Sequence, residues 1–484
     1  MFQTLKNAWK TPELRTKLLF TLVIVILYRL GASIVVPWVD PSMVELATTT
    51  YNGTILEYLN ILSGGALSQA TLFALSVSPY ITASIVMQLL TIAIPKLEEL
   101  SKDGEEGRKK ISAITRIVTI VLALVTAFGY SMMIISQGMT KLYVPNSTFT
   151  SFTWINGDAS TGFSLGEIFK HGAGLQFITI IACYCAGAAL VMWLAEKINE
   201  KGIGNGISII LFANILAGVP STVVSLWSLA STPFKMAGGK FHYSMIVGPI
   251  LALVILAVVV AAVYYVVWFT NSERRIPVQY AKRVVGRKMY GGQASNLPLK
   301  LNMSGVMPII FANAIVTIPG TIVMFTQNVK WMSKVNGFLA NFNQTNPVYI
   351  VLFAILLVAF AFFYIMISFN PVEVANNIRN NGGAIPGIRP GKPTKDYIQK
   401  ILNRITFIGA IFLAVIAVLP MIVFAILAIE PVSHALVDAR LDMSVISGIA
   451  FAGSSLLIVA GVALETIREL EAQLTMRNYK GFLD

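Results

Sequence analysis

Long apolar runs constrain this sequence more than any other feature, because they recur ten times along its 484 residues. Each run has about 18 to 25 residues, the length at which an α-helix crosses the hydrocarbon core of a bilayer. Hydrocarbon offers no hydrogen-bond partner to an open backbone, so such a run is helical there. We therefore expect an all-α polytopic membrane protein whose ten transmembrane helices lie near residues 18–36, 74–95, 117–137, 174–195, 207–228, 247–270, 303–326, 348–369, 405–429 and 444–464.

The composition excludes an ordinary water-soluble enzyme. Charged residues make up 12% of the chain and hydrophobic residues 56%, whereas a soluble domain has about 25% charged residues. The net charge of +13 follows from topology: with the N-terminus inside, 28 of the 36 Lys and Arg residues lie in cytoplasmic segments and seven in external ones, while Arg29 lies in the first run. This asymmetry obeys the positive-inside rule and predicts that both termini are cytoplasmic.

Two of the cytoplasmic loops, at about 271–302 and 370–404, are long and basic. The positive-inside rule alone accounts for basic loops, but short loops would fix the topology equally well. Their length therefore favours a docking role, and a basic cytoplasmic surface suits ribosomal RNA, an acidic motor protein or anionic lipid. The candidate docking residues are Arg274, Arg275, Lys282, Arg283, Arg287 and Lys288 in the first loop, and Arg389 and Lys392 in the second.

A short motif occurs at corresponding places in the second and seventh runs. Residues 77–83 and 306–312 share the pattern V-x-P-x-I-x-A. If these runs are the second helices of two five-helix halves, the odd number of helices makes the halves inverted repeats, with the functional site at their interface. We therefore expect an N-terminal half over residues 1–228 and a C-terminal half over 229–484. The alternative is a chance match, since Val, Ile, Pro and Ala are common in membrane helices.

The sequence lacks the usual components of an active site. The three histidines form no paired metal motif, and Cys183 and Cys185 point to different faces of one predicted helix, so neither a zinc site nor a disulfide framework is encoded. The glycine-rich segments 202–206 and 387–393 each depart from a nucleotide-binding loop at a required position. We therefore expect no catalytic residue, no metal and no cofactor.

Intramembrane charge distinguishes a passive conduit from an ion-coupled transporter. The interiors of the ten runs contain no Asp, Glu, Lys or His and a single Arg, Arg29, which is expected to reach the interface or a neighbouring carbonyl. A charge at the bilayer centre costs about 2.5 to 3.5 kcal/mol on insertion scales, so transporters keep such groups for ion coupling. Their scarcity argues against ion-coupled transport. An inverted-repeat secondary transporter of a small solute and a non-conducting docking scaffold remain the alternatives.

Five stretches of the chain carry motifs. The first is Pro79–Ile85 followed by Gln88 at the start of the second run. The others are Trp193–Ile198, Gly202–Ser208, Tyr280–Arg283 and Gly387–Gly391. In this order and at these topological positions, they together resemble the SecY family of large subunits of the bacterial protein-conducting channel. The resemblance implies a channel that passes unfolded secretory polypeptides across the membrane and releases transmembrane segments sideways into lipid.

The resemblance also implies an hourglass of ten helices that is closed outside by a short re-entrant plug at about 58–72 and at the waist by an aliphatic ring. The implied lateral gate lies between helices 2 and 7. The implied plug residues are Ile61, Leu62, Ser63, Gly64, Gly65, Ala66 and Leu67. The implied ring residues are Val77, Ile81, Ile207, Leu211, Ile310 and Ile458, and the implied gate residues are Pro79, Gln88 and Pro308.

The residue types of the implied ring suit a seal. Aliphatic side chains offer water and ions no hydrogen bonds, so a constriction made of them dewets. Val77 and Ile81 are spaced i,i+4 and therefore share one helix face. The alternative is that these residues face lipid or simply pack, and the alternative for the plug is an external loop. Gln88 is hypothesised to make a polar contact across the gate.

The family resemblance further implies partners and a location. These are the SecE and SecG subunits, the SecA motor ATPase, the ribosome, a translocating polypeptide with its signal sequence and anionic lipid, at the bacterial plasma membrane. Two features depart from the family pattern. Ser76 stands where the family usually has Gly, which is expected to alter packing at the gate hinge, and the external segment 138–174 is long.

Overall fold

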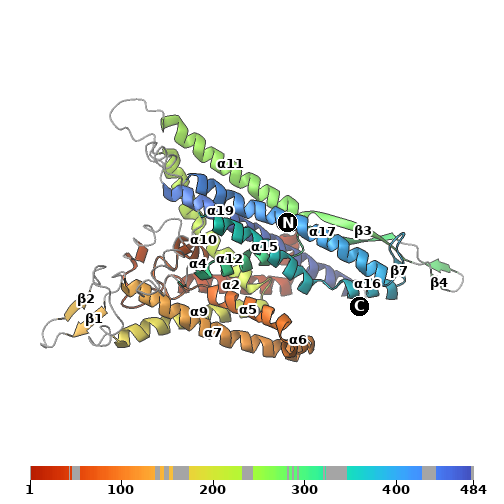
Figure 1. Cartoon of the computed structure of the whole chain (residues 1–484), viewed down its shortest axis with the longest axis horizontal. Coiled ribbons are helices and arrows are strands. Elements are labelled where there is room, and N and C mark those ends of the chain that lie inside the picture. The colour runs from red at the N-terminus through yellow and green to blue at the C-terminus, as the bar shows by residue number, and fades with distance from the viewer. Residues whose placement is uncertain are drawn as a thin grey trace.

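A computed structural model describes most of the chain. The described residues are 2–42, 44–45, 55–136, 142–145, 152–155, 174–231, 244–280, 283–285, 288–290, 294–319, 322, 346–427 and 443–480. The long helices run roughly along one direction and form an elongated bundle (Figure 1). Each of the ten predicted spans overlaps one helix. These helices are α2 (Pro12–Gly31), α5 (Ser78–Ala93), α7 (Gly104–Ser136), α9 (Gly174–Lys201), α10 (Gly206–Ser231), α11 (Ser244–Asn271), α12 (Met307–Val316), α15 (Pro347–Ser368), α17 (Lys392–Leu427) and α19 (Met443–Lys480).

The surface of the bundle is apolar. Within the described residues, six helices are long and apolar enough to cross a membrane, or seven if α5 and the following α6 (Pro95–Lys102), which meet at 101°, form one broken span. On α11 the large side chains of Leu253 and Trp268 are 68% and 57% exposed. A helix that is apolar all round and still exposed matches lipid rather than water as its solvent.

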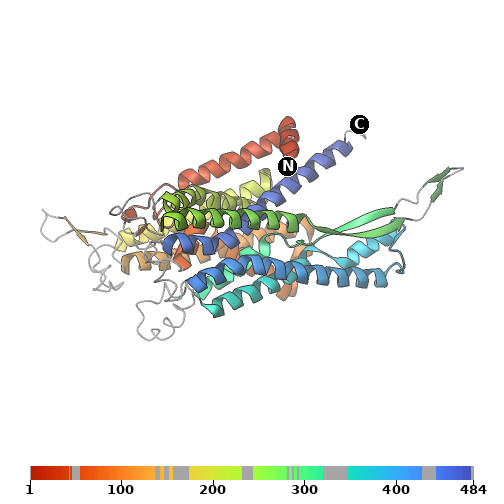
Figure 2. The same ribbon diagram turned by 90° about the horizontal axis from the view of Figure 1, so that it is seen from above.

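Two small β-structures lie at opposite ends of the bundle (Figures 1 and 2). At one end, β1 (Leu142–Pro145) pairs with β2 (Phe152–Ile155). At the other end lies a three-stranded sheet in the order β6–β3–β7, and beyond it a separate two-stranded sheet of β4 and β5 (Figure 1). The strands at this end are β3 (Glu273–Tyr280), β4 (Arg283–Val285), β5 (Lys288–Tyr290), β6 (Ala294–Lys300) and β7 (Gly383–Ala384). We call these five strands the basic arm.

The basic arm joins two loops that the sequence suggests as separate. Gln279 of β3 lies opposite Ala384 of β7, so the loops at 271–302 and 370–404 share one sheet. The side chains of Ile276 and Val278 are buried and pack in one cluster with residues of α17 and of α16 (Pro371–Asn380). The arm is therefore anchored to the bundle at its base. Helix α1 (Phe2–Lys10) and the end of α19 lie on the same side of the bundle as the arm (Figure 2).

The repeated V-x-P motif marks two equivalent helix starts. Val77 and Val306 are the N-cap residues of α5 and α12, and Pro79 and Pro308 lie in the first turns. A proline there sacrifices no helical hydrogen bond, because the first N–H groups have no intrahelical acceptor. The prediction that both prolines stand near helix starts is confirmed.

The segment before α5 enters the bundle as a short helix, α4 (Ile55–Ser63), followed by turns. Helix α4 ends at Ser63 because Gly64 and Gly65 adopt φ angles of 66° and 87°, a conformation open to glycine and disfavoured for other residues. The predicted plug is therefore helical only in its first part. Gly64, Gly65, Ala66 and Leu67 lie in turns.

Candidate functional site

The six predicted ring residues lie together at the centre of the bundle. All belong to one hydrophobic cluster, and none is more than 8% exposed. They come from separate parts of the chain: α5 with its N-cap, α10, α12 and α19. They therefore point into the protein and not toward lipid, as a central constriction requires. The residues are Val77, Ile81, Ile207, Leu211, Ile310 and Ile458.

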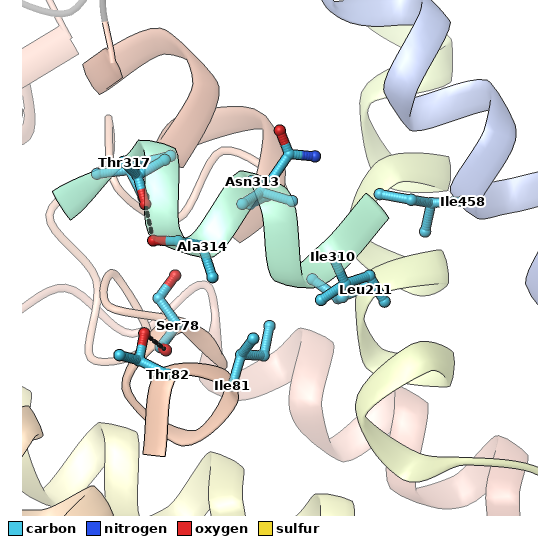
Figure 3. A pocket seen from close by; sticks show the side chains of 11 residues that line it. Ser78, Ile81, Thr82, Leu211, Ile310, Asn313, Ala314, Thr317 and Ile458 are labelled. Atoms are coloured by element: carbon cyan, nitrogen blue, oxygen red, sulfur yellow. Dashed lines mark hydrogen bonds between the residues drawn. The ribbon is translucent and has the colours of Figure 1, made fainter. Parts of the chain in front are cut away.

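A small cavity of about 30 Å³ adjoins this cluster. Four ring residues line it, namely Ile81, Leu211, Ile310 and Ile458. In Figure 3, Ser78 and Ile81 of α5 lie opposite Ala314 and Ile310 of α12. The cavity thus lies where the second helices of the two predicted halves meet, and Ile81 and Ile310 each stand four residues after the N-cap valine of their helix.

Asn313 is one of the lining residues of the cavity that were not predicted from the sequence. Asn313 of α12 is 3% exposed, and neither atom of its side-chain amide has a hydrogen-bond partner among the described residues. An unpaired buried amide is costly, by about 1 to 3 kcal/mol. The sequence signal for this residue was a single asparagine within an otherwise apolar helix. That signal does not distinguish a cavity-lining residue from one that packs in the core.

The predicted plug residues lie inside the bundle and not on its surface. Ser63, Ala66 and Leu67 are buried, with exposed fractions of 0%, 1% and 3%, while Ile61, Leu62, Gly64 and Gly65 are half-buried. Leu62 lines the cavity beside the ring residues. A plain external loop, the alternative for this segment, would leave these side chains in water.

Side chains of neighbouring helices hold the backbone of the plug. Tyr130 of α7 donates to the carbonyl of Leu67 at 2.9 Å, and Arg29 of α2 donates from Nη1 to the carbonyl of Gly64 at 2.9 Å. The charge in the first span therefore meets a carbonyl, as the sequence suggests. A cation hydrogen-bonded to a carbonyl is a stronger contact than a neutral pair. These bonds hold the predicted plug segment against α2 and α7.

Within the described residues, the side chain of Gln88 forms a hydrogen bond on its own helix. Its Nε2 donates to Ser84 Oγ at 3.4 Å, one turn earlier in α5. In this state the polar contact that Gln88 makes is therefore within one helix and does not cross to α12. No group of His, Cys, Asp or Glu residues that could hold a metal ion occurs within the described part of the chain.

The predicted docking residues gather on the basic arm and beside it. Arg274 and Arg275 on β3, and Arg389 and Lys392 before and at the start of α17, are exposed. Arg275 pairs with Glu273 at 2.8 Å, which offsets part of the charge. Arg283 and Lys288 lie on β4 and β5. Lys282 and Arg287 lie outside the described residues.

Arg468 of α19 connects the arm's base to the bundle. Its Nη2 donates to the carbonyl of Thr270 at 2.6 Å and to Asn271 Oδ1 at 2.9 Å, at the C-terminus of α11. A cation is favourable at that end of a helix dipole. At the end of β6, partial burial and the nearby Arg468 lower the pKa of the Lys300 amine from its ordinary value. The positive charges here are thus held close together.

Two equivalent helices that meet at a buried aliphatic centre, next to a re-entrant segment, define a helical membrane channel. The chain belongs to the SecY family, because residues 71–467 match the SecY family model. It is 40% identical over 486 residues to the protein translocase subunit SecY of Streptomyces galbus, and the match covers 100% of both chains.

Solved channel structures share the fold. One, described as showing that the plug domain of SecY stabilises the closed state of the translocation channel and maintains a membrane seal, matches with a TM-score of 0.58 and 17% identity. Another, of Sec61 in the canine ribosome–channel complex from the endoplasmic reticulum, matches with a TM-score of 0.54 and 16% identity. Each match covers 94% of this chain and 92% of the other. The predicted fold class is therefore confirmed.

Proposed function

We propose that this chain forms the pore of a protein translocase, through which unfolded secretory polypeptides cross the membrane and from which apolar segments leave sideways into lipid. Membership of the SecY family supports the activity. The observation that carries the proposal is the meeting of six buried aliphatic residues from four parts of the chain at one centre. The small-solute transporter, the alternative suggested by the inverted repeat, finds no support among these relatives.

The pore works by gating, without a chemical step. At rest, the aliphatic ring excludes ions because it offers them no replacement for their hydration shell. A polypeptide can part the same side chains, because hydrophobic contacts are non-directional and re-form around it. The plug covers the ring on its outer side, and separation of α5 from α12 opens the seam next to the cavity that Ile81 and Ile310 line.

The basic arm is the proposed docking surface for cytoplasmic partners. One strand from each predicted loop belongs to the same sheet, so the exposed Arg274 on β3 and Arg389, which follows β7, lie on connected segments. A positive surface of this kind attracts ribosomal RNA, an acidic motor such as SecA, and anionic lipid. The relative Sec61 is described in complex with a ribosome. SecE and SecG are the proposed membrane partners.

The proposed orientation puts the arm and both termini in the cytoplasm of a bacterial cell, with the channel in the plasma membrane. The charge asymmetry of the sequence supports this orientation. Its geometric support is that α1, the end of α19 and the arm share one side of the bundle, while β1 and β2 lie at the other end.

Site-specific photo-crosslinking tests the pore. A crosslinking amino acid at Ile81 or Ile310, in the complex engaged with a stalled secretory polypeptide, should capture that polypeptide. The matched control is Leu253 of α11, which is 68% exposed on the outer surface and should capture none. Capture at Leu253 with none at Ile81 and Ile310 would overturn the proposed pore, and would favour a docking scaffold.

Charge reversal tests the docking surface. The double variant Arg389→Glu with Lys392→Glu should weaken binding of SecA or of ribosomes roughly ten-fold, since two exposed cations become anions. Lys96→Glu on α6, exposed but outside the arm, is the matched control and should change affinity less than two-fold by the same estimate. Equal affinity of the wild-type protein and both variants would remove Arg389 and Lys392, beside the arm, from the proposed docking surface.

A further inference from the structure

Three polar side chains from distant parts of the chain meet at the end of the plug helix α4. They are Tyr28 of α2, Ser76 just before α5 and Asn214 of α10. All three are buried, with exposed fractions of 0%, 3% and 0%. Two of them bind the carbonyl of Leu62, which accepts from Asn214 Nδ2 at 2.7 Å and from Ser76 Oγ at 3.3 Å, and the Tyr28 hydroxyl contacts both of these side chains. An apolar bundle therefore encloses a polar cluster around one backbone atom of the plug.

The orientation of the Asn214 amide is fixed by its partners. The carbonyl of Leu62 can only accept, so the Nδ2 group must face it. The same nitrogen lies 2.9 Å from the Tyr28 hydroxyl and 3.2 Å from Ser76 Oγ. Asn214 Oδ1 is left without a hydrogen-bond partner among the described residues, although it is buried. The hydrogen bond from Asn214 to Leu62 thus leaves the other amide atom, Oδ1, buried without a partner among the described residues.

Ser76 shows a second sign of strain at the same place. Its φ angle is 50°, in the left-handed region where a residue with a Cβ is disfavoured. Glycine, the residue expected here from the family resemblance, would adopt this conformation freely. The Cβ of a serine destabilises this backbone conformation, but the Ser76 hydroxyl forms hydrogen bonds with Leu62 and Asn214. The departure from the family pattern is therefore explained by hydrogen bonding to the plug.

We infer that Ser76 and Asn214 are positioning residues for the plug, and that with Tyr28 they form a polar latch on the Leu62 carbonyl. The inference rests on the proposed channel function. Ser76 directly precedes Val77, the N-cap of α5, so movement of this gate helix pulls the Ser76 hydroxyl from Leu62. The latch therefore links opening of the gate to release of the plug.

The unsatisfied acceptor gives the latch two usable states. With the plug seated, Leu62 is held but Asn214 Oδ1 is unpaired. With the plug displaced, water enters the space and hydrates both Asn214 and Ser76, as it does in any water-filled pore. The free-energy difference between the seated and the displaced plug is therefore smaller than a count of the hydrogen bonds to Leu62 suggests. A seal that must yield to a signal sequence requires such a small difference.

Labelling of the plug in the assembled complex tests the latch. The native Cys183 and Cys185 are replaced by Ser, and Ile61→Cys, in the half-buried part of the plug helix, serves as the reporter for a membrane-impermeant maleimide. Asn214→Leu and Ser76→Ala should each raise the labelling rate and the resting ion conductance roughly ten-fold, because each removes hydrogen bonds to Leu62. Thr222→Val on α10, whose hydroxyl donates to the carbonyl of Gly218 on its own helix, should change neither.

The variant Ser76→Gly distinguishes the effect of the Ser76 hydroxyl from the effect of the left-handed backbone conformation. If the hydroxyl holds the plug, glycine raises labelling as alanine does. If backbone conformation alone matters, glycine relaxes the left-handed residue and lowers labelling, while alanine leaves it unchanged; that result would overturn the latch. The double variant Ser76→Ala with Asn214→Leu should increase labelling by less than the product of the single effects, because both residues bind one carbonyl.

The wild-type complex separates failure of the proposed channel function from failure of the latch. If it does not transport a secretory polypeptide into vesicles, the proposed function is wrong. If it does, and Asn214→Leu and Ser76→Ala label at the wild-type rate, only the latch is wrong. Should Asn214→Leu not assemble, Tyr28→Phe, which removes a hydroxyl bonded to Asn214, replaces it with the same expected direction.

Discussion

The centre of the bundle is closed by two unlike sets of contacts. The ring is a cluster of buried aliphatic side chains from four parts of the chain, whereas the plug is held by hydrogen bonds from Arg29, Tyr130 and Asn214 to its backbone carbonyls. Hydrophobic contact does not depend on direction, so the ring seals around whatever lies within it. Hydrogen bonds weaken steeply when misaligned, so the plug has one seated position. In the proposed channel, the ring therefore controls leakage, and the polar contacts control when the plug leaves.

The largest expected effect comes from a charge placed in the ring. Ile310→Asp puts a carboxylate where the native side chain is 4% exposed. Desolvating an ion costs several kcal/mol, so the closed state is destabilised and the constriction hydrates. Resting ion conductance in planar bilayers should rise by about two orders of magnitude, at 1.4 kcal/mol for each factor of ten. Ile310→Leu preserves an apolar ring and should leave conductance within about two-fold. Equal conductance of the Asp and Leu variants would contradict an ion seal at this position.

A smaller effect is expected where the plug backbone turns. At Gly64, with φ of +66°, an added Cβ would lie 2.9 Å from Arg29 Nη1 and 3.0 Å from the backbone of Asn214. Gly64→Ala therefore prevents seating of the plug, and maleimide labelling of Ile61→Cys should rise about ten-fold, since strain and lost hydrogen bonds each cost about 1 kcal/mol or more. Gly65→Ala is the matched control, because Gly65 also has a positive φ, +87°, but no atom within 4 Å of its added Cβ. Identical labelling of the two variants would show that backbone strain, and not crowding, governs seating.

The contact of Arg29 contributes less, because this side chain is exposed. Arg29→Met removes the hydrogen bond to the Gly64 carbonyl and should raise plug labelling by about two- to five-fold, as expected for a bond worth about 0.5 to 1 kcal/mol. Arg15→Met, at the other end of α2, removes a cation without touching the plug and should have no effect. A change of equal size in both variants would point to net charge and not to the bond with Gly64.

The sequence predicts the apolar framework well because lipid imposes a simple rule on it. A helix in hydrocarbon needs a long uncharged run, and each of the ten predicted runs contains a helix. The prolines of the V-x-P motif also lie in first turns, as expected. Hydropathy did not predict the basic arm. A count of charges registers Arg274 and Arg275, but it does not register that Ile276 and Val278, two residues apart, share one face of a strand. That period of two was the available signal for a strand.

The polar contacts of the plug could not be derived from sequence. Tyr28, Ser76 and Asn214 lie in three separate segments, and nothing local indicates that they meet. Each of them alone is an ordinary residue of a membrane helix or turn. Arg29 alone was a usable signal, because a charge in a transmembrane span needs a partner. The partner, the carbonyl of Gly64, could not be predicted, because its place depends on how the plug folds back.

The smallest expected effect tests the gate away from the ring and the plug. Gln88 was expected from its sequence position to bridge α5 and α12, but its bond at 3.4 Å runs to Ser84 on α5 itself. A long bond within one helix adds a few tenths of a kcal/mol at most, so Gln88→Leu should change the transport of wild-type relative to defective signal sequences by less than about two-fold. Ser84→Ala removes the same bond from its other side and should match it. If Gln88→Leu changed selectivity strongly while Ser84→Ala did not, Gln88 would have to contact α12 or the signal sequence in the open gate. Polar contacts would then be as important at the gate as they are at the plug.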